Sequence, residues 1–207
     1  MRLVMPRLYV ILDARLMTGS AEETAKQLIE AGVRMLQYRS KRGSARETLE
    51  ISACLARIAE EKSVALFVND RPDIAALSGA SGVHVGQTDL SVEDAREVIG
   101  EGKWVGVSTH TEKQFRAAIK TSADYVAMGP VFATKSKEDP DAVVGTEFVR
   151  RVRGLTAKPI VAIGGITLER AAEVMDAGAD SVAVISDILR AENPVRRAEE
   201  FLRVVEG

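Results

Sequence analysis

The sequence predicts a closed barrel of eight parallel β-strands, each followed by an α-helix: a (β/α)8 (TIM) barrel. Short apolar segments alternate with helical patterns along all 207 residues, and the links between them are short. Strict alternation of this kind demands a parallel sheet, and eight units is the number that closes into a barrel. A doubly wound open sheet is the alternative, but no Gly-x-Gly-x-x-Gly motif follows the first strand. We therefore expect residues 1–207 to form one barrel domain.

The expected strands are apolar, partly β-branched segments, and the expected helices carry apolar residues at helical spacing. Strands are expected at residues 8–13, 35–39, 65–69, 82–86, 103–107, 125–131, 159–163 and 181–185. Helices are expected at residues 20–31, 44–62, 72–77, 91–99, 111–120, 146–152, 168–177, from 186 onward, and 194–205. Ser20 and Ser91 each precede an acidic residue at capping-box spacing, which marks two of the helix starts.

The composition is that of a soluble globular protein. Apolar residues make up 46% of the chain, charged residues 28%, and the formal net charge is −2. Basic residues are interleaved with acidic ones, which argues against a nucleic-acid partner. No apolar run is long enough to cross a bilayer and the N-terminus lacks signal-peptide features, so we expect a cytoplasmic protein with no membrane partner. The single cysteine, Cys54, is expected to be a small buried residue. The sequence leaves a homo-oligomer open.

Two consecutive strand ends are suited to phosphate. The seventh strand ends in Gly164-Gly165 just before a helix, and the eighth ends at Ile185-Ser186 before another. Glycine lets a ligand approach the backbone closely, and a helix start offers unpaired N–H groups to an anion. These loops are frequent phosphate sites in such barrels. A tight turn without a ligand is the alternative interpretation of the two glycines.

Polar residues also interrupt the ends of strands two to four. Gln37, Arg39 and Lys41 alternate along the second strand and should face the barrel mouth together. Unpaired buried charge is costly, so the two cations require either a phosphate or structural salt bridges with neighbouring carboxylates. Asp70 and Asp89 follow the third and fourth strands. Two close carboxylates repel unless a proton or cation lies between them, and Mg²⁺ beside phosphate is the natural choice, although Asp89 alone could cap a helix.

The histidines and the longest loop complete the candidates. His84 lies among apolar residues and is interpreted as a packed interior side chain. His110 follows the fifth strand and should face the mouth, as an acid/base or a ligand contact. Ser108 lacks a Ser-His-Asp context and is a hydrogen-bond donor rather than a nucleophile. The polar loop 132–145 has the composition of a mobile lid or ligand clamp, with a solvated surface loop as the alternative.

Together these segments resemble the thiamine-phosphate synthase family of barrel enzymes, over nearly the whole chain. The shared motifs are Gln-aromatic-Arg-x-Lys at 37–41, Asn-Asp at 69–70, Gly-Gln-x-Asp at 86–89, Val-Ser-x-His-Thr at 107–111, Gly-Gly at 164–165 and Ile-Ser at 185–186. The family's Thr-x-Thr-Lys loop stands here as Thr134-Lys135-Ser136-Lys137, with a serine that keeps the hydroxyl.

The resemblance implies a role for each of these residues. The pyrimidine diphosphate would be held by Gln37, Arg39, Lys41, Asn69, Ser108 and Lys137. The thiazole phosphate would be held by Thr134, Ser136, Gly165, Ile185 and Ser186. Asp70 and Asp89 would bind Mg²⁺, and the catalytic candidates are Lys41, Ser108 and Lys137.

The reaction that this resemblance implies is alkyl transfer between two phosphorylated small molecules. Hydroxymethylpyrimidine diphosphate would lose pyrophosphate, and the thiazole nitrogen would capture the pyrimidinyl-methyl cation, with fixed cations and Mg²⁺ assisting the leaving group. Three alternatives stay open: a thiazole tautomerase of the same superfamily that uses His110, a non-catalytic sensor of thiamine precursors, and an unrelated phosphate-binding barrel enzyme. The pair Asp70 and Asp89 argues against the first two, and no acid/base pair supports the third.

Overall fold

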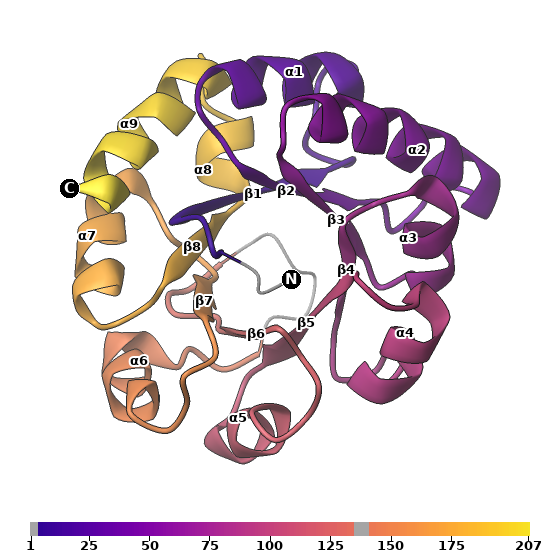
Figure 1. Ribbon diagram of the computed structural model, residues 1–207. Helices are drawn as coiled ribbons and strands as arrows, with labels where there is room; N and C mark the ends of the chain where they lie inside the picture. The colour runs from indigo at the N-terminus through magenta and orange to yellow at the C-terminus, as the bar shows by residue number, and fades with distance from the viewer. Residues whose placement is uncertain (1–3, 135–140) are drawn as a thin grey trace.

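The computed structural model describes residues 4–134 and 141–207, and it confirms the predicted barrel (Figure 1). Eight parallel strands pair in sequence order, and the last pairs with the first through Leu8↔Val182 and Val10↔Val184. The helices surround the barrel on its outside, as Figure 1 shows in a view along the axis. The carboxyl ends of all the strands therefore meet at one mouth.

The elements follow the predicted order closely. The strands are β1 (Leu8–Asp13), β2 (Met35–Arg39), β3 (Ala65–Asn69), β4 (Gly82–Val85), β5 (Trp104–Thr109), β6 (Tyr125–Met128), β7 (Ile160–Ile163) and β8 (Ser181–Val184). The helices are α1 (Ala21–Glu30), α2 (Ala45–Glu61), α3 (Pro72–Ser78), α4 (Val92–Ile99), α5 (Glu112–Ala118), α6 (Gly145–Arg153), α7 (Leu168–Asp176), α8 (Ser186–Leu189) and α9 (Pro194–Glu206). The sixth strand is shorter than expected: it ends at Met128, before Pro130, which has no N–H to donate to a neighbouring strand.

Side-chain caps mark the predicted helix starts. The Ser20 hydroxyl accepts a hydrogen bond from the backbone N–H of Glu23 at 3.3 Å, and the Ser91 hydroxyl accepts one from Asp94 at 3.1 Å. Each such cap satisfies an otherwise unpaired N–H and contributes about 1 kcal/mol. The side chain that caps α4 is thus Ser91, and the expectation that Asp89 alone could be a helix cap is wrong.

Apolar residues form two layers. The larger layer lies between strands and helices, and the smaller one fills the barrel interior around Tyr9, Phe67 and Tyr125. The Phe67 ring lies 5.9 Å from the Tyr9 ring and 5.5 Å from the Tyr125 ring, measured between centroids. These aromatic side chains close the barrel below the mouth, so polar residues one layer higher line a cavity with a floor rather than a channel.

Two expectations from composition can be compared with the structure. Within the described ranges, no helix is long and apolar enough to cross a membrane. Cys54 is a free thiol on α2, and it is partly exposed rather than buried as expected, because it lies between the inner and outer faces of that helix.

Candidate functional site

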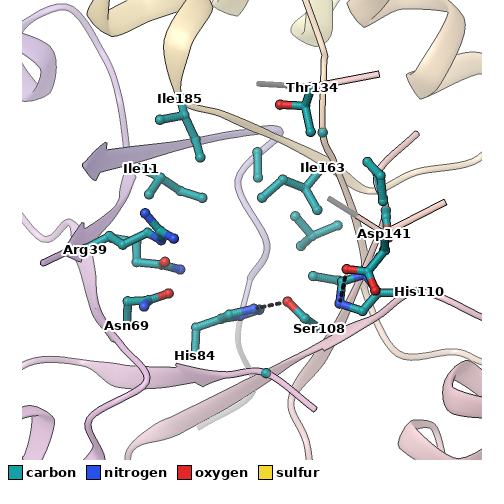
Figure 2. Close-up of a pocket in the computed structure, with 18 of the residues that line it drawn as sticks. Ile11, Arg39, Asn69, His84, Ser108, His110, Thr134, Asp141, Ile163 and Ile185 are labelled. Carbon is teal, nitrogen blue, oxygen red and sulfur yellow. Dashed lines mark hydrogen bonds and ion pairs between the residues drawn. The ribbon is translucent and has the colours of Figure 1, made fainter. Parts of the chain in front are cut away.

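A cavity of about 500 Å³ opens at the carboxyl ends of the strands (Figure 2). It brings together nearly all the side chains and glycines that the sequence predicted: Gln37, Arg39, Lys41, Asn69, Asp70, Asp89, Ser108, Thr134, Gly165, Ile185 and Ser186. The other two predicted residues, Ser136 and Lys137, lie outside the described residues. Figure 2 shows Arg39 and Asn69 on one side of the cavity and Thr134 on the other.

Strand β2 places its polar residues as expected. Gln37 and Arg39 line the cavity, whereas Tyr38 belongs to the outer apolar layer. Arg39 donates to the carboxylate of Asp13, a residue that is only 1% exposed and also receives Arg15 Nε at 3.1 Å and the Arg15 backbone N–H at 3.0 Å. Burial acts to raise the pKa of the Asp13 carboxyl, but the hydrogen bonds from Arg15 and the charge of Arg39 outweigh it and hold that pKa below its usual range.

Lys41 also has a carboxylate partner. Its ammonium group donates to Asp70 at the rim of the cavity. Of the two alternatives for these cations, the structural salt bridges are present: Asp13 and Asp70 balance Arg39 and Lys41. An anion is favoured instead by the position of the cations at the mouth. Arg39 and Lys41 each carry more N–H donors than their carboxylate partner uses.

The predicted carboxylate pair is present. The side chains of Asp70 and Asp89 lie against each other, and Asp89 Oδ2 accepts the Gly86 N–H at 2.7 Å. Asp70 adopts a left-handed backbone conformation, with φ of 61°, and its N–H donates to the His84 carbonyl at 2.8 Å. Burial raises the pKa of Asp89, and the hydrogen bond and negative charge of Asp70 raise it further. Such a pair is stabilised by taking up a proton or a cation.

The donor set suits Mg²⁺ better than a soft metal. Among residues 4–134 and 141–207, no group of three or more His, Cys, Asp and Glu side chains is placed to hold a metal ion. Two carboxylates leave the remaining ligand positions to water and to phosphate oxygens of a substrate, which is the usual way in which Mg²⁺ is bound.

The two glycines after β7 have a packing role that the sequence did not reveal. Gly164 and Gly165 adopt φ of +99° and +62°, and a Cβ on Gly165 would lie 2.4 Å from the carbonyl oxygen of Ala133. The segment after β6 is hydrogen-bonded to this turn, with Phe132 N–H donating to Gly164 O at 3.0 Å. The glycines therefore allow the base of the 132–145 loop to lie directly on the predicted phosphate site.

The helix start behind these glycines is partly occupied. The Leu168 N–H, the first of α7, donates to the carboxylate of Asp187 at 3.3 Å. Asp187 is in turn paired with Arg197 at 3.1 Å. The first N–H of α7 is therefore already hydrogen-bonded, unlike the arrangement that the sequence suggested for an anion at this helix start.

His84 is buried as predicted, but its environment is polar. Its Nδ1 lies 2.8 Å from the Tyr125 hydroxyl and its Nε2 lies 2.8 Å from Ser108 Oγ. Tyr125 is 3.2 Å from the Tyr9 hydroxyl, which accepts from Gln37 Nε2 at 2.6 Å. We call these five side chains, Gln37, Tyr9, Tyr125, His84 and Ser108, the floor network. Sequence analysis missed Tyr9 and Tyr125, whose only signal is a hydroxyl in an apolar strand.

His110 faces the mouth as predicted. Its Nδ1 lies 2.6 Å from the Gly129 carbonyl oxygen, which fixes Nδ1 as the donor, and its Nε2 lies 3.5 Å from Asp141 Oδ2. Its backbone N–H donates to the side chain of Gln114 at 2.8 Å. Asp141 follows the undescribed residues of the loop, so His110 contacts the end of that loop, as Figure 2 shows.

Comparison with known proteins identifies the family. The family model described as thiamine monophosphate synthase matches residues 8–188. Thiamine-phosphate synthase of Koribacter versatilis is 51% identical, over 98% of this chain and 97% of that protein, and that of Haloarcula marismortui is 41% identical, over 96% of each. The structure of thiamine phosphate pyrophosphorylase from Pyrococcus furiosus superposes with a TM-score of 0.88 at 34% identity, covering 97% of this chain and 95% of that one. The chain belongs to the thiamine monophosphate synthase family.

Proposed function

We propose that this chain is a thiamine-phosphate synthase, a transferase that couples hydroxymethylpyrimidine diphosphate with hydroxyethylthiazole phosphate and releases pyrophosphate. One observation carries the proposal: two sets of anion-binding residues approach a single cavity from opposite sides of the barrel. One set comes from β2 to β5 and the other from the segments after β6, β7 and β8. A cavity of about 500 Å³ has the size of a site for small molecules. Membership of the family supports the same conclusion.

The first set would hold the pyrimidine diphosphate. Arg39 and Lys41 supply positive charge at the mouth, and each is oriented by a carboxylate, Asp13 or Asp70. Cations that are already fixed in place stabilise the negative charge that develops on the departing pyrophosphate, because they do not have to move as the reaction proceeds. Gln37 and Ser108 offer hydrogen bonds to the ring, and Asn69, at the end of β3, lines the same cavity.

Asp70 and Asp89 would hold Mg²⁺, which when bound neutralises diphosphate oxygens and so makes pyrophosphate a better leaving group. Burial, and after it the hydrogen bond and charge of Asp70, raise the pKa of Asp89, so without a cation the two carboxyls resist ionising together. The Lys41 ammonium, already against Asp70, then lies beside the phosphates that approach this pair. The carboxylates thus draw both positive charge and diphosphate to one rim of the cavity.

The second set would hold the thiazole phosphate. Thr134, Gly165, Ile185 and Ser186 line the opposite side of the cavity, and Ser136 follows in the loop. Lys137, in the same loop, would reach across to the pyrimidine diphosphate of the first set. Hydroxyl and backbone N–H groups bind a phosphate without adding charge. The two phosphates would therefore be separated across the mouth, with the reacting carbon and nitrogen between them.

The reaction needs no general base. The carbon–oxygen bond of the pyrimidine diphosphate breaks and its electron pair leaves with pyrophosphate, and the thiazole nitrogen lone pair then forms the new carbon–nitrogen bond. The attacking nitrogen carries no proton to remove. What the chain must supply is orientation and exclusion of water from the cation. Ile11, Ile163 and Ile185 form an apolar wall beside the ring-binding residues (Figure 2).

The test is an incubation with both phosphorylated substrates, with and without Mg²⁺, in which thiamine phosphate and pyrophosphate are measured. We expect metal-dependent formation of both products in equal amounts. Asp70→Asn and Asp89→Asn should each reduce the rate by at least tenfold, and Asp73→Asn, an exposed aspartate paired with Arg71, is the matched control. Binding of thiazole phosphate without product would overturn the proposal and favour a tautomerase that uses His110, which proton exchange into the thiazole would then detect.

A further inference from the structure

The floor network crosses the barrel without a break. Five side chains from β1, β2, β4, β5 and β6 form four consecutive hydrogen bonds, with donor–acceptor distances of 2.6, 3.2, 2.8 and 2.8 Å. Its two ends, Gln37 and Ser108, are both predicted ligand contacts. A network that links two ligand contacts through buried groups can control how each one presents its hydrogens.

The first half of the network has a defined direction. The Gln37 amide nitrogen can only donate, so the Tyr9 hydroxyl oxygen accepts from it. A phenol has one hydrogen, and the neighbour in range for the Tyr9 hydrogen is the Tyr125 hydroxyl. Tyr125 therefore accepts from Tyr9 and directs its own hydrogen to His84 Nδ1. Burial raises the pKa of both phenols, so both carry the hydrogens that this order requires.

The second half follows from the chemistry of imidazole. A ring nitrogen that accepts a hydrogen bond carries no hydrogen, so an imidazole with one accepting nitrogen has its N–H on the other. Since Nδ1 accepts from Tyr125, the hydrogen lies on Nε2 and is donated to Ser108 Oγ. The Ser108 hydroxyl hydrogen is then left to point into the cavity. The Ser108 backbone is held by Gln87, whose side-chain amide donates to its carbonyl at 2.7 Å.

We propose that Tyr9, Tyr125 and His84 are positioning residues, which make the Ser108 hydroxyl a hydrogen-bond donor toward the substrate ring. The donor-to-acceptor direction that begins at the Gln37 amide continues through these three buried side chains to Ser108, on the opposite wall of the cavity. A donor at this position selects a ligand with an acceptor, such as an unprotonated ring nitrogen, and disfavours one that presents N–H or C–H there. This inference rests on the proposed function only for its kinetic test.

The fold makes room for this arrangement. Gly106 on β5 lies directly against Tyr125, and a Cβ at that position would be 2.0 Å from Tyr125 Cζ and 2.4 Å from its hydroxyl. The ring of Tyr125 is stacked on that of His84, with centroids 5.6 Å apart and planes at 25°. Phe67 also packs against Tyr125, with the two ring planes at 81°. Tyr125 therefore has one position, in which its hydroxyl meets both Tyr9 and His84.

The direct test is the tautomer of His84, read by nitrogen-15 NMR of the substrate-free protein labelled at histidine. The chain has two histidines, so spectra of the wild type and of His110→Asn assign the signals. We expect a protonated Nε2 and an unprotonated Nδ1 for His84. A protonated Nδ1 would reverse the whole network, make Ser108 an acceptor and overturn the proposal. This measurement needs neither substrate nor turnover, so its result is independent of the proposed function.

The kinetic test is a double-mutant cycle between Tyr125→Phe and Ser108→Ala. Tyr125→Phe keeps the ring and removes the hydrogen bond to Nδ1, so we expect KM for the pyrimidine diphosphate to rise about five- to tenfold, the effect of one lost hydrogen bond. In the Ser108→Ala background the same substitution should change KM less than twofold, because its effect passes through Ser108. Additive effects would overturn the proposal. Tyr38→Phe is the control, a buried tyrosine on the outer face of β2.

Discussion

Asp13 offers the sharpest test of how the cation side of the mouth is built. It is 1% exposed at the end of β1, and its carboxylate meets the guanidinium groups of Arg15 and Arg39. Asp13→Asn keeps the size of the side chain and removes the charge. Both arginines then lose their counter-charge, and Arg39 no longer has a fixed position above Gln37. We expect lower stability together with weaker binding of the diphosphate.

The magnitude follows from the exposure of the partners. Breaking a fully buried ion pair by removing one partner costs about 3–5 kcal/mol. The side chains of Arg39 and Arg15 are 15% and 27% exposed, so water recovers part of this cost. We therefore expect a loss of about 3 kcal/mol, toward the lower end of that range. For a chain of this length such a loss lowers Tm by about 6–12 °C.

The stability that Asp13 contributes should decrease in acid. The folded-state pKa of Asp13 lies below that of the unfolded chain, so the stability it contributes is complete above about pH 4, the ordinary pKa of the group. It is lost as the pH falls through the lower folded-state pKa. The difference in unfolding free energy between wild type and Asp13→Asn should thus be constant from about pH 5 to about pH 8 and should shrink on further acidification.

The assay is chemical denaturation followed by circular dichroism, with Asp73→Asn as the matched control. Asp73 also pairs with an arginine two residues away, but the side chains of Arg71 and Asp73 are 44% and 52% exposed. An exposed pair contributes less than about 1 kcal/mol, so the control should unfold almost as the wild type does. Equal losses for Asp13→Asn and Asp73→Asn would refute the argument from burial. A difference that does not begin to shrink as the pH falls below about 4 would refute the assignment to the Asp13 charge.

Three further predictions concern the barrel interior and one of its helices. Gly106→Ala should destabilise the fold by about 1–3 kcal/mol in denaturation, because the added Cβ meets the ring of Tyr125 at 2.0 Å. His84, with its pKa lowered from 6.5 to about 4, stays neutral while the unfolded chain takes up a proton, so about 3 kcal/mol of stability should be lost as the pH falls across that interval; a His84→Asn variant should show a shallower acid slope. Ser52→Ala on α2 should leave stability unchanged or raise it by up to about 1 kcal/mol, because the buried hydroxyl has no partner among the described residues. A loss of more than about 1 kcal/mol for Ser52→Ala in calorimetry would contradict this prediction.

The barrel and most of the site could be predicted because both depend on local patterns. Eight apolar segments that alternate with helices determine the sheet, and the sheet brings the ends of β2, β3, β4 and β5 to one mouth. Strand periodicity then decides which side chains face inward, so Gln37 and Arg39 were correctly separated from Tyr38. Helix boundaries were correct to within a few residues for the same reason, since Ser20 and Ser91 are visible as caps in the sequence.

The pairing of charges could not be predicted, because it depends on distances between strands. The sequence left a ligand and a salt bridge as alternatives for Arg39 without naming its carboxylate, which is Asp13, opposite Arg39 in the β1–β2 register. In the sequence, nothing distinguishes Asp13 from any polar residue that ends a strand before a loop. Likewise Gly164 and Gly165 suggested contact with a ligand, but nothing in the sequence indicated that their positive φ values and their contact with residues 130–133 also serve the packing of the loop base.

The floor network is the clearest example of a feature that the sequence alone does not reveal, and the barrel fold explains how it forms. Tyr9, His84 and Tyr125 each stand alone in an apolar strand, and an isolated polar residue there is most often a packed side chain with one satisfied hydrogen bond. Because the closed barrel directs interior side chains of β1, β4 and β6 toward one another, these three lie within hydrogen-bond range although they are far apart in sequence. Burial then removes water as a competing partner and keeps the phenols protonated and the imidazole neutral. With every protonation state fixed in this way, the orientation of the Gln37 amide determines that the Ser108 hydroxyl donates a hydrogen bond to the substrate rather than accepting one.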